Sequence, residues 1–562
     1  MGAGPERARS ERFLQGHRTA SVLLLSCGHG YRPRDMERGW ERRGVWALAL
    51  VAVVAWVLRF FPLAREGGAF GYPIDYAEGL YYSASALFFQ GHWPYRDFVF
   101  VHPPGSLLLW WPATLVGSGW GADTGFAAAR WMATLCGAFN VLLVGRLSLR
   151  IWGPVAGIVS ALVYASFPET VLIERGPYLE PLLNLACLSA ANMWLVPPDS
   201  GRERTWWIVA GALFGLAVSV KLLGGIWLFA ALLSRPLSFS WDWRPQATLL
   251  AAAGVAAALI LGPFFLQAPS ELLSQVFFFQ ALRPADGDLN HMGRLYELFP
   301  ERRLVGLGLA LLGLVLVAVR AFRTTQPTRT AERFFAVTYI LTITAFLSSP
   351  SYWNQYNTFA ASDSVLAGVG AAAICQWVEG WWPRQGRVVV VLLGLAVVLP
   401  TLHSLRGGLF LKAPDQLALG RYIREKVSPD APLFAFEPAW GLAAGRLPPV
   451  IPGAPLVVDS YALMLQSGMA AGQRLAHAEE TFHTSASQQP ICELLGRSDF
   501  VVLGWRGERQ LSEQSRQWFR SSFTRRFPES GKEGPDLWER TSRPQEGQEA
   551  GCHGGKSPPA SP

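Results

Sequence analysis

The chain has 562 residues, of which 51% are hydrophobic and only 16% are charged. A soluble globular protein normally carries about a quarter charged residues, so the composition excludes an ordinary soluble protein. The net charge of +8 does not indicate nucleic-acid binding, because most arginines lie in short loops between long apolar runs. Charge reaches an ordinary level only after about residue 406. The sequence therefore predicts a membrane bundle followed by a water-soluble domain.

The first 43 residues are basic and contain a single short apolar patch, residues 21–26. The apolar core of a signal peptide needs about 7–15 residues, so this patch does not predict one. We expect residues 1–43 to form a disordered cytoplasmic extension, in which Met36 is an alternative start.

Eleven apolar stretches are candidates for membrane-spanning helices, each of which needs about 20 mostly apolar residues. They are 44–64, 125–148, 154–168, 178–196, 206–221, 222–234, 246–267, 304–320, 334–349, 356–377 and 388–405. Several are short or share a boundary. We expect an all-α polytopic membrane bundle of about 11 transmembrane helices over residues 44–405.

The arginines indicate how this bundle is oriented. With the N-terminus inside, the inner loops hold Arg146, Arg150, Arg202, Arg204, Arg235, Arg244, Arg320, Arg323, Arg329, Arg333, Arg384 and Arg387. The outer loops are sparse in Arg and Lys, with Arg302 and Arg303 the main exceptions. This alternation follows the positive-inside rule. It predicts a multi-pass protein of the cytoplasmic (inner) membrane whose C-terminal domain lies outside.

Two outer segments, 65–124 and 268–303, are longer than connectors need to be, and loops of this length are usually functional or disordered. Their aromatic content argues against disorder. In the first segment, 76–90 and 104–117 are too short to cross the membrane but are rich in apolar and aromatic residues. We expect them to be helices lying in the membrane interface.

Residues 406–541 have the pattern of a small soluble α/β domain, with strand-like runs between helical ones. We expect helices at 415–427, 488–497 and 508–520, and strands at 432–436, 455–459, 499–504 and 523–527. Residues 542–562 read as a disordered tail. The six cysteines show no metal-ligand spacing, and a Cys492–Cys552 disulfide would require that the tail is exported.

Carboxylates at the outer boundary are the candidates for chemistry. Asp75 and Glu78 are three residues apart at the start of a predicted helix, where they share one face. The plain alternative is that they only cap this helix. Other polar residues are predicted to gather on the same side of the membrane, where polar groups usually mark a site. These candidates are Asp97, His102, Glu174, Arg175, Glu180, Lys221, Tyr352 and Tyr356.

For two of these candidates the alternatives are specific. His102 precedes a proline pair, where a lone histidine is more often structural than catalytic. Lys221 lies at the outer end of an apolar helix, where it either extends its amine to the interface or binds a lipid phosphate.

Several motifs in order resemble the GT-C glycosyltransferases, especially the bacterial branch related to protein O-mannosyltransferases and lipid A aminoarabinose transferases. They are DYAEGLYYSASALFFQGHWPYRDFVFVHPPG in the first outer loop, then RLSLRIWG, LEP, VSVKLLGG and SYWNQY, within residues 44–405. The resemblance implies an inverting sugar transfer from a polyprenyl-phosphate donor, with a first-loop acid as general base. Many members carry an adjacent Asp-Glu pair there, whereas here Ala77 separates Glu78 from Tyr76 and Asp75. The base is therefore either Asp75 or Glu78.

The predicted function is transfer of a sugar from a polyprenyl-phosphate carrier to a glycan, lipid or protein acceptor on the outer face. The chain has no GxxxxGK[ST] sequence, which argues against ATP-driven transport. The alternatives are a lipid or sugar transporter or flippase, and a relative that binds a lipid-linked sugar without catalysis. A divalent metal, Mg²⁺ or Mn²⁺, is a candidate cofactor because acidic groups bind such ions, but the sequence shows no ligand set.

Overall fold

The computed structural model describes residues 34–197, 201–235, 242–286, 291–298, 303–323, 329–359, 361–382, 385–528, 535–541 and 552. The chain divides into two units, Met1–Trp46 and Ala47–Pro562. The helical bundle from residue 47 onward, the outer loops and the C-terminal domain belong to the second unit. Residues 1–33 of the predicted extension and most of the predicted tail lie outside the described residues.

A helix coincides with each of the eleven predicted spans. These helices are α2 (Arg34–Phe60), α6 (Ala122–Trp152), α7 (Pro154–Ser166), α9 (Glu180–Leu195), α10 (Glu203–Val220), α11 (Gly224–Leu233), α12 (Arg244–Gln267), α16 (Leu304–Arg323), α17 (Thr330–Ser348), α18 (Ala361–Trp381) and α19 (Gly386–Leu409). The first begins at Arg34 and not at residue 44, so helix replaces the disorder expected for residues 34–43.

Seven helices in the described part of the chain are long and apolar enough to cross a membrane, and α7 and α11 are shorter apolar helices. The predicted all-α bundle is confirmed, and the number of eleven crossings stays a prediction. Small residues let the helices pack closely, as is common in membrane bundles. A Cβ atom at Gly211 or Gly215 of α10 would overlap the carbonyl groups of Leu249 and Ala253 in α12.

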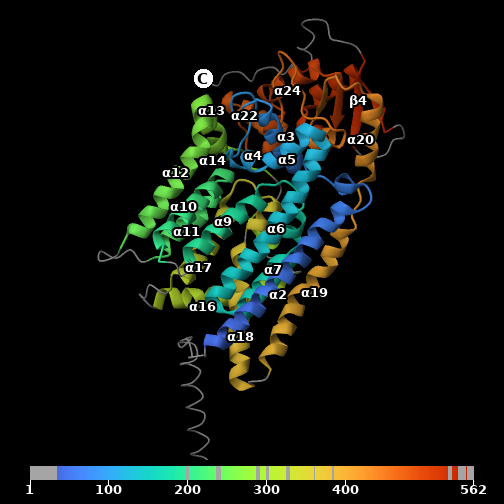
Figure 1. The fold of residues 1–562 in the computed structure, drawn as a ribbon. Helices are drawn as coiled ribbons and strands as arrows, with labels where there is room; N and C mark the ends of the chain where they lie inside the picture. Colours follow the sequence, from blue (N-terminus) through green and yellow to red (C-terminus); the bar gives the residue numbers. More distant parts are fainter. Residues whose placement is uncertain are drawn as a thin grey trace, which may run out of the picture. The chain divides into compact units, whose positions relative to one another are not determined.

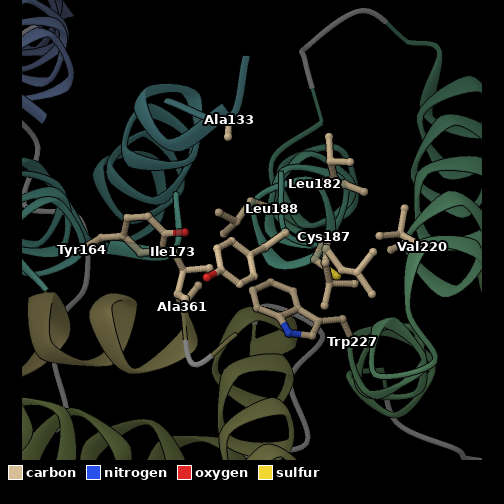
Figure 2. Close-up of a cluster of buried hydrophobic side chains, with 14 of the residues drawn as sticks. Ala133, Tyr164, Ile173, Leu182, Cys187, Leu188, Val220, Trp227 and Ala361 are labelled. Carbon is tan, nitrogen blue, oxygen red and sulfur yellow. The ribbon is translucent and has the colours of Figure 1, made fainter. Parts of the chain in front are cut away.

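The core of the bundle is apolar at its centre. Side chains of several helices meet there, including Leu188 and Cys187 of α9, Val220 of α10 and Trp227 of α11 (Figure 2). These four side chains are essentially fully buried.

The first outer segment forms α3 (Tyr76–Phe89), α4 (Gly105–Leu109) and α5 (Trp111–Trp120). The helix predicted at 76–90 is confirmed, and the helix predicted at 104–117 is divided into α4 and α5. Their expected position in the membrane interface is wrong for α3, which is buried from Tyr76 to Leu87. It lies against the C-terminal domain, where a Cβ at Gly79 would overlap the backbone of Ala439 in α21 (Pro438–Ala443). Small side chains along α3 allow this enclosure on several sides. Figure 1 shows α3, α4 and α5 at the end of the bundle that carries the C-terminal domain.

The C-terminal domain is a four-stranded sheet with helices, which confirms its α/β character. The strands β1 (Leu433–Ala435), β2 (Phe500–Leu503), β3 (Phe523–Phe527) and β4 (Asp536–Arg540) have the order β1-β2-β4-β3. The first two pair in parallel and the other pairs are antiparallel. The helices besides α21 are α20 (Pro414–Lys426), α22 (Ser460–Ala470), α23 (Ala478–Phe482), α24 (Ser485–Arg497), α25 (Trp505–Gln510) and α26 (Glu513–Ser522).

Three of the four predicted strands are confirmed, but the strand predicted at 455–459 is wrong. The chain there has no strand and leads into α22, whose first turn is capped by the Asp459 carboxylate accepting from Ala462 N at 2.9 Å. The fourth strand, β4, was not predicted, and the helix expected at 508–520 is divided into α25 and α26. Cys492 and Cys552 form a disulfide that joins α24 to the tail.

Short elements complete the outer side and its connections. They are η1 (Phe61–Ala64), η2 (Gly68–Phe70), α8 (Pro168–Ile173), α13 (Pro269–Leu272), the π-helical η3 (Leu273–Phe278), α14 (Phe279–Leu282), α15 (His291–Leu298) and η6 (Asn354–Phe359). Two of them, α14 and η6, matter most for the site, because each is next to or includes a side chain of the cluster described below.

Candidate functional site

Asp75 and Glu78 form a reciprocal cap at the start of α3. Oδ1 of Asp75 accepts a hydrogen bond from Ala77 N at 2.9 Å, and Oε1 of Glu78 accepts from Asp75 N at 3.1 Å. This capping box satisfies backbone N–H groups that have no partner inside the helix. The two acids differ in exposure, since Asp75 is exposed and Glu78 is buried.

Glu78 is occupied by a second partner, Arg130 of α6. Nε and Nη2 of Arg130 lie 2.8 and 2.9 Å from the two carboxylate oxygens of Glu78. The same guanidinium donates to carbonyl oxygens of the loop before α3, at Ala69, Tyr72 and Pro73. Glu78 therefore fixes this loop on the bundle, and both of its oxygens are already used.

Glu174 and Arg175 also make internal contacts. Glu174 forms a buried ion pair with Arg59 at 2.7 Å and accepts from Asn140 and Tyr164 at 2.8 Å each. Arg175 donates to the Tyr72 hydroxyl at 2.7 Å and to two backbone carbonyls. The structure thus places these two candidates in the framework that supports the outer loops.

Asp97 and Tyr352 have local partners as well. Asp97 pairs with Arg96 at 2.8 Å and accepts from Trp93 N at 2.7 Å, which closes a turn. The hydroxyl of Tyr352 donates to the side-chain oxygen of Asn357. Both contacts have a structural explanation.

The remaining candidates come together in one cluster. Lys221, at the end of α10, lies 2.6 Å from Glu180 at the start of α9. Its Nζ also lies 4.4 Å from the ring centre of Tyr356 in η6. Arg283, which follows α14, contacts the Tyr356 hydroxyl. Two cations and one carboxylate thus surround a partly buried phenol.

The electrostatics of this cluster are positive. Burial alone would raise the pKa of Tyr356, but Arg283 and Lys221 more than offset this effect and lower the pKa below its ordinary value. His102, whose Nε2 lies 3.1 Å from the Tyr81 hydroxyl, faces the same cations. Burial, and then Lys221 and Arg283, hold the pKa of His102 well below its usual value.

Asp75 belongs to the same neighbourhood. Burial raises the pKa of Tyr81, and electrostatic interactions with Glu180, Tyr356, Asp459 and Asp75 raise it further. These groups therefore lie within electrostatic range of one side chain. The structure brings together seven of the ten predicted site residues around Tyr81 and Tyr356, because the Tyr352 ring centre also lies 6.0 Å from that of Tyr356. The seven are Asp75 with its capping partner Glu78, His102, Glu180, Lys221, Tyr352 and Tyr356.

Sequence reasoning missed several members of the site. Arg283 lies in the long segment 268–303, whose length had indicated a function but not a residue. The C-terminal domain contributes Asp459, which accepts from the Tyr76 hydroxyl at 2.6 Å, and Arg506, whose Cζ lies 4.0 Å from the Tyr76 ring centre. Arg130 could have been recognised from the sequence, because it is a charged residue inside an apolar span and such residues usually have a function.

No group of three or more His, Cys, Asp or Glu side chains that could hold a metal ion occurs in the described parts of the chain. Two other acids of the site have cationic partners, since Glu78 pairs with Arg130 and Glu180 with Lys221. The candidate Mg²⁺ or Mn²⁺ site therefore has no residue set assigned to it.

Comparisons with known proteins agree with this architecture. Residues 101–265 match the family model described as dolichyl-phosphate-mannose-protein mannosyltransferase. The fold is similar to that of ArnT from Cupriavidus metallidurans in the apo state, with a TM-score of 0.58 and 15% identity over 87% of this chain and 97% of that one. ArnT bound to undecaprenyl phosphate gives a TM-score of 0.57 and 14% identity, with the same coverage.

A third similar structure is the Archaeoglobus fulgidus oligosaccharyltransferase tethered with an acceptor peptide. Its TM-score is 0.54, with 14% identity over 82% of this chain and 69% of that one. No curated protein sequence matches the chain. At these identities the likeness shows the fold, and it confirms the GT-C fold that the sequence motifs indicate.

The role of Glu78 predicts the effect of its replacement. Glu78→Gln keeps the size of the side chain but leaves the Arg130 charge buried without a counter-ion, which typically costs about 3–5 kcal/mol. We expect a strongly reduced melting temperature in detergent, together with lost activity. Glu66→Gln, which changes a fully exposed carboxylate of the same outer segment, is the matched control. A Glu78→Gln protein that is inactive but as stable as the wild type would contradict this structural role.

Proposed function

We propose that the protein transfers a sugar from a polyprenyl-phosphate carrier to an acceptor at the outer face of the membrane. The observation that carries this proposal is the Lys221–Arg283–Tyr356 cluster, which lies in one neighbourhood with the exposed carboxylate of Asp75. A cationic subsite suits a phosphate, and a free carboxylate beside it suits proton removal. The GT-C fold and the ArnT structure bound to undecaprenyl phosphate support the proposal.

The cationic subsite, formed by Lys221 and Arg283, has hydrogen-bond donors without partners. Among the described residues, Arg283 has only the Tyr356 hydroxyl as a hydrogen-bonding partner, and its buried Nε has none. Glu180 neutralises the charge of Lys221. The charge of Arg283, in contrast, has no carboxylate within ion-pair distance in the described chain. A phosphate group would supply that missing charge and accept these donors. This subsite would hold the lipid phosphate.

Asp75 is the better candidate for the general base. Its Oδ1 is held by Ala77 N, whereas Oδ2 has no hydrogen-bond partner among the described residues. A carboxylate oriented in this way and open to solvent can accept a proton from an acceptor hydroxyl. Glu78, with both oxygens used by Arg130, would position Asp75 by holding the start of α3.

The proposed reaction is an inverting substitution at the anomeric carbon. The acceptor oxygen forms a bond to this carbon while the bond to the phosphate oxygen breaks, and the hydroxyl proton passes to Asp75. The departing polyprenyl phosphate gains negative charge, which Lys221 and Arg283 would stabilise. The remaining partners are the sugar's acceptor, which is a glycan, a lipid or a protein, and the surrounding membrane lipids.

The orientation that places this site outside has independent support. The arginines of the predicted inner loops indicate it, and so does the Cys492–Cys552 disulfide, because disulfides persist mainly in oxidising compartments. We therefore propose that the α/β domain, residues 406–541, is extracytoplasmic.

The cationic subsite predicts how binding of the lipid phosphate depends on Arg283. Arg283→Gln removes the charge but keeps a side chain of similar shape, so we expect the dissociation constant for undecaprenyl phosphate to rise about 10-fold to 100-fold, as for a lost charge-assisted hydrogen bond. The measurement is thermal stabilisation of the detergent-solubilised protein by the lipid. Arg283 is the better choice than Lys221, because loss of Lys221 would leave Glu180 buried without a partner.

The control is Arg474→Ala, which removes an exposed arginine of the C-terminal domain and should leave lipid binding unchanged. Undecaprenyl phosphate that stabilises the Arg283→Gln protein as well as the wild type would refute the proposed subsite.

The proposed orientation predicts which cysteines can be labelled from outside. In a protein lacking Cys27, we expect Asp430→Cys in the C-terminal domain to react with a membrane-impermeant maleimide on intact cells or spheroplasts. Gln385→Cys, in the loop between α18 and α19, should react only after lysis. Both positions are exposed, while the other native cysteines are disulfide-bonded or lie in bundle helices. The reverse labelling pattern would overturn the orientation and the outer-face site.

A further inference from the structure

Arg506 extends from the C-terminal domain into a group of four aromatic rings. Its Cζ lies 4.0 Å from the ring centre of Tyr76, 4.8 Å from Trp505, and 5.7 Å from both Trp353 and Tyr461. These rings come from four segments that are separated in the sequence. A guanidinium over aromatic faces is held in position by cation–π attraction.

Docking of the C-terminal domain on α3 does not use the hydrogen-bond donors of Arg506. The Tyr76 hydroxyl donates to Asp459 at 2.6 Å and accepts from Tyr461 N at 3.4 Å. Close backbone packing of Gly79 on Ala439 joins the same two parts. These contacts account for the interface, so the guanidinium donors of Arg506 are left for another purpose.

No described residue accepts a hydrogen bond from the guanidinium N–H groups of Arg506. The Arg506 guanidinium also has no carboxylate within ion-pair distance in the described chain, and its Nε is buried without a partner. The backbone N of Arg506 is held by Glu437 Oε1 at 2.9 Å, which fixes where the side chain starts. Buried polar groups without a partner are uncommon, and a missing ligand is one explanation.

Arg506 is not part of the Lys221–Arg283–Tyr356 cluster, but it shares a neighbour with the proposed base, because both Arg506 and Asp75 act electrostatically on the Glu437 carboxylate. Its nearest ring belongs to Tyr76, the residue after Asp75. Tyr461 lies between the two cationic regions, because both Arg283 and Arg506 act on its phenol and partly offset the burial that raises its pKa. A group bound to Arg506 would therefore lie in the same part of the site as Asp75.

We propose that Arg506 binds an oxyanion, a carboxylate or phosphate, on the acceptor, so that the C-terminal domain positions the acceptor against Asp75. This inference rests on the proposed function and adds a second anion subsite, separate from that of the lipid phosphate. The planar guanidinium offers paired donors that match the two oxygens of such a group.

The test uses the full chain in detergent, first saturated with undecaprenyl phosphate and then titrated with inorganic phosphate at constant ionic strength. We expect phosphate to raise the melting temperature of the wild type in a saturable way. Arg506→Gln should lose this response, and Arg506→Lys should keep a weaker one. The matched control is Arg509→Ala on the same helix, whose arginine pairs with Glu479 and should respond as the wild type does.

A transfer assay separates acceptor binding from a merely structural role. Membranes of cells that lack the protein supply the acceptor, and a lipid extract of the same cells supplies the donor. With Arg506→Gln we expect the membrane concentration for half-maximal rate to rise about tenfold or more, with no change in the half-saturating donor concentration.

Three results would overturn the inference. The first is a phosphate response that is unchanged in Arg506→Gln. The second is a phosphate response that disappears once undecaprenyl phosphate is bound, because phosphate would then occupy the donor subsite. An unchanged acceptor dependence in Arg506→Gln would overturn this inference alone. A wild-type protein that neither binds undecaprenyl phosphate nor transfers sugar would overturn the proposed function together with it.

Discussion

The ion pair between Arg130 of α6 and Glu78 of α3 is the contact on which the site depends. Arg130 is fully buried, and a buried guanidinium is tolerated only when its donors are used and its charge is compensated. Glu78 supplies the charge, and three carbonyl groups of the preceding loop use further donors. The pair thereby fixes both the loop and the first turn of α3. Asp75, which caps that turn, is held in one position while its carboxylate stays open to solvent.

The charged groups of the outer side fall into two classes. Glu174 with Arg59, and Glu78 with Arg130, are buried and mutually satisfied, and they support the loops. Arg175, Arg283 and Arg506 each have a buried Nε without a partner among the described residues. Arg175 still donates to the Tyr72 hydroxyl and to two carbonyls, whereas Arg283 has only the Tyr356 hydroxyl and the Arg506 guanidinium has no hydrogen bond there. A satisfied pair contributes to the fold, whereas an unsatisfied cation is a place where an anion can bind. This difference in pairing, and not the mere presence of charges, separates the framework from the candidate site.

Local patterns were enough to predict most of the fold. Apolar runs located a helix for every predicted span, and the spacing of Asp75 and Glu78 indicated the cap that the structure shows. The buried position of α3 was not predictable from its own residues, because its apolar and aromatic side chains suit a membrane interface as well as a protein interior. Only the C-terminal domain that covers it distinguishes the two environments. The strand expected at 455–459 failed for a similar reason, since its apolar residues are buried without pairing in the sheet.

The site itself was predicted in part. Lys221 and Tyr356 could be recognised because they stand at the ends of apolar runs, but the pairing of Lys221 with Glu180 joins two different helices. Arg506 lies in the soluble domain, where an arginine is ordinary, and its position over Tyr76 depends on tertiary structure. Sequence patterns report neighbours along the chain, whereas the partners that decide between a structural and a binding role come from distant segments.

We propose that a lipid-linked sugar is the donor and that Asp75 is the base. The measurement that tests it most directly is sugar transfer by the purified protein, wild type and Asp75→Asn, with a polyprenyl-phosphate sugar or a nucleotide sugar as the donor. The account predicts transfer from the lipid donor alone, and a rate about 10²–10⁴ lower for Asp75→Asn at unchanged stability, as expected for loss of a general base. Turnover of a UDP- or GDP-sugar without a lipid carrier, or undiminished transfer by Asp75→Asn, would contradict it.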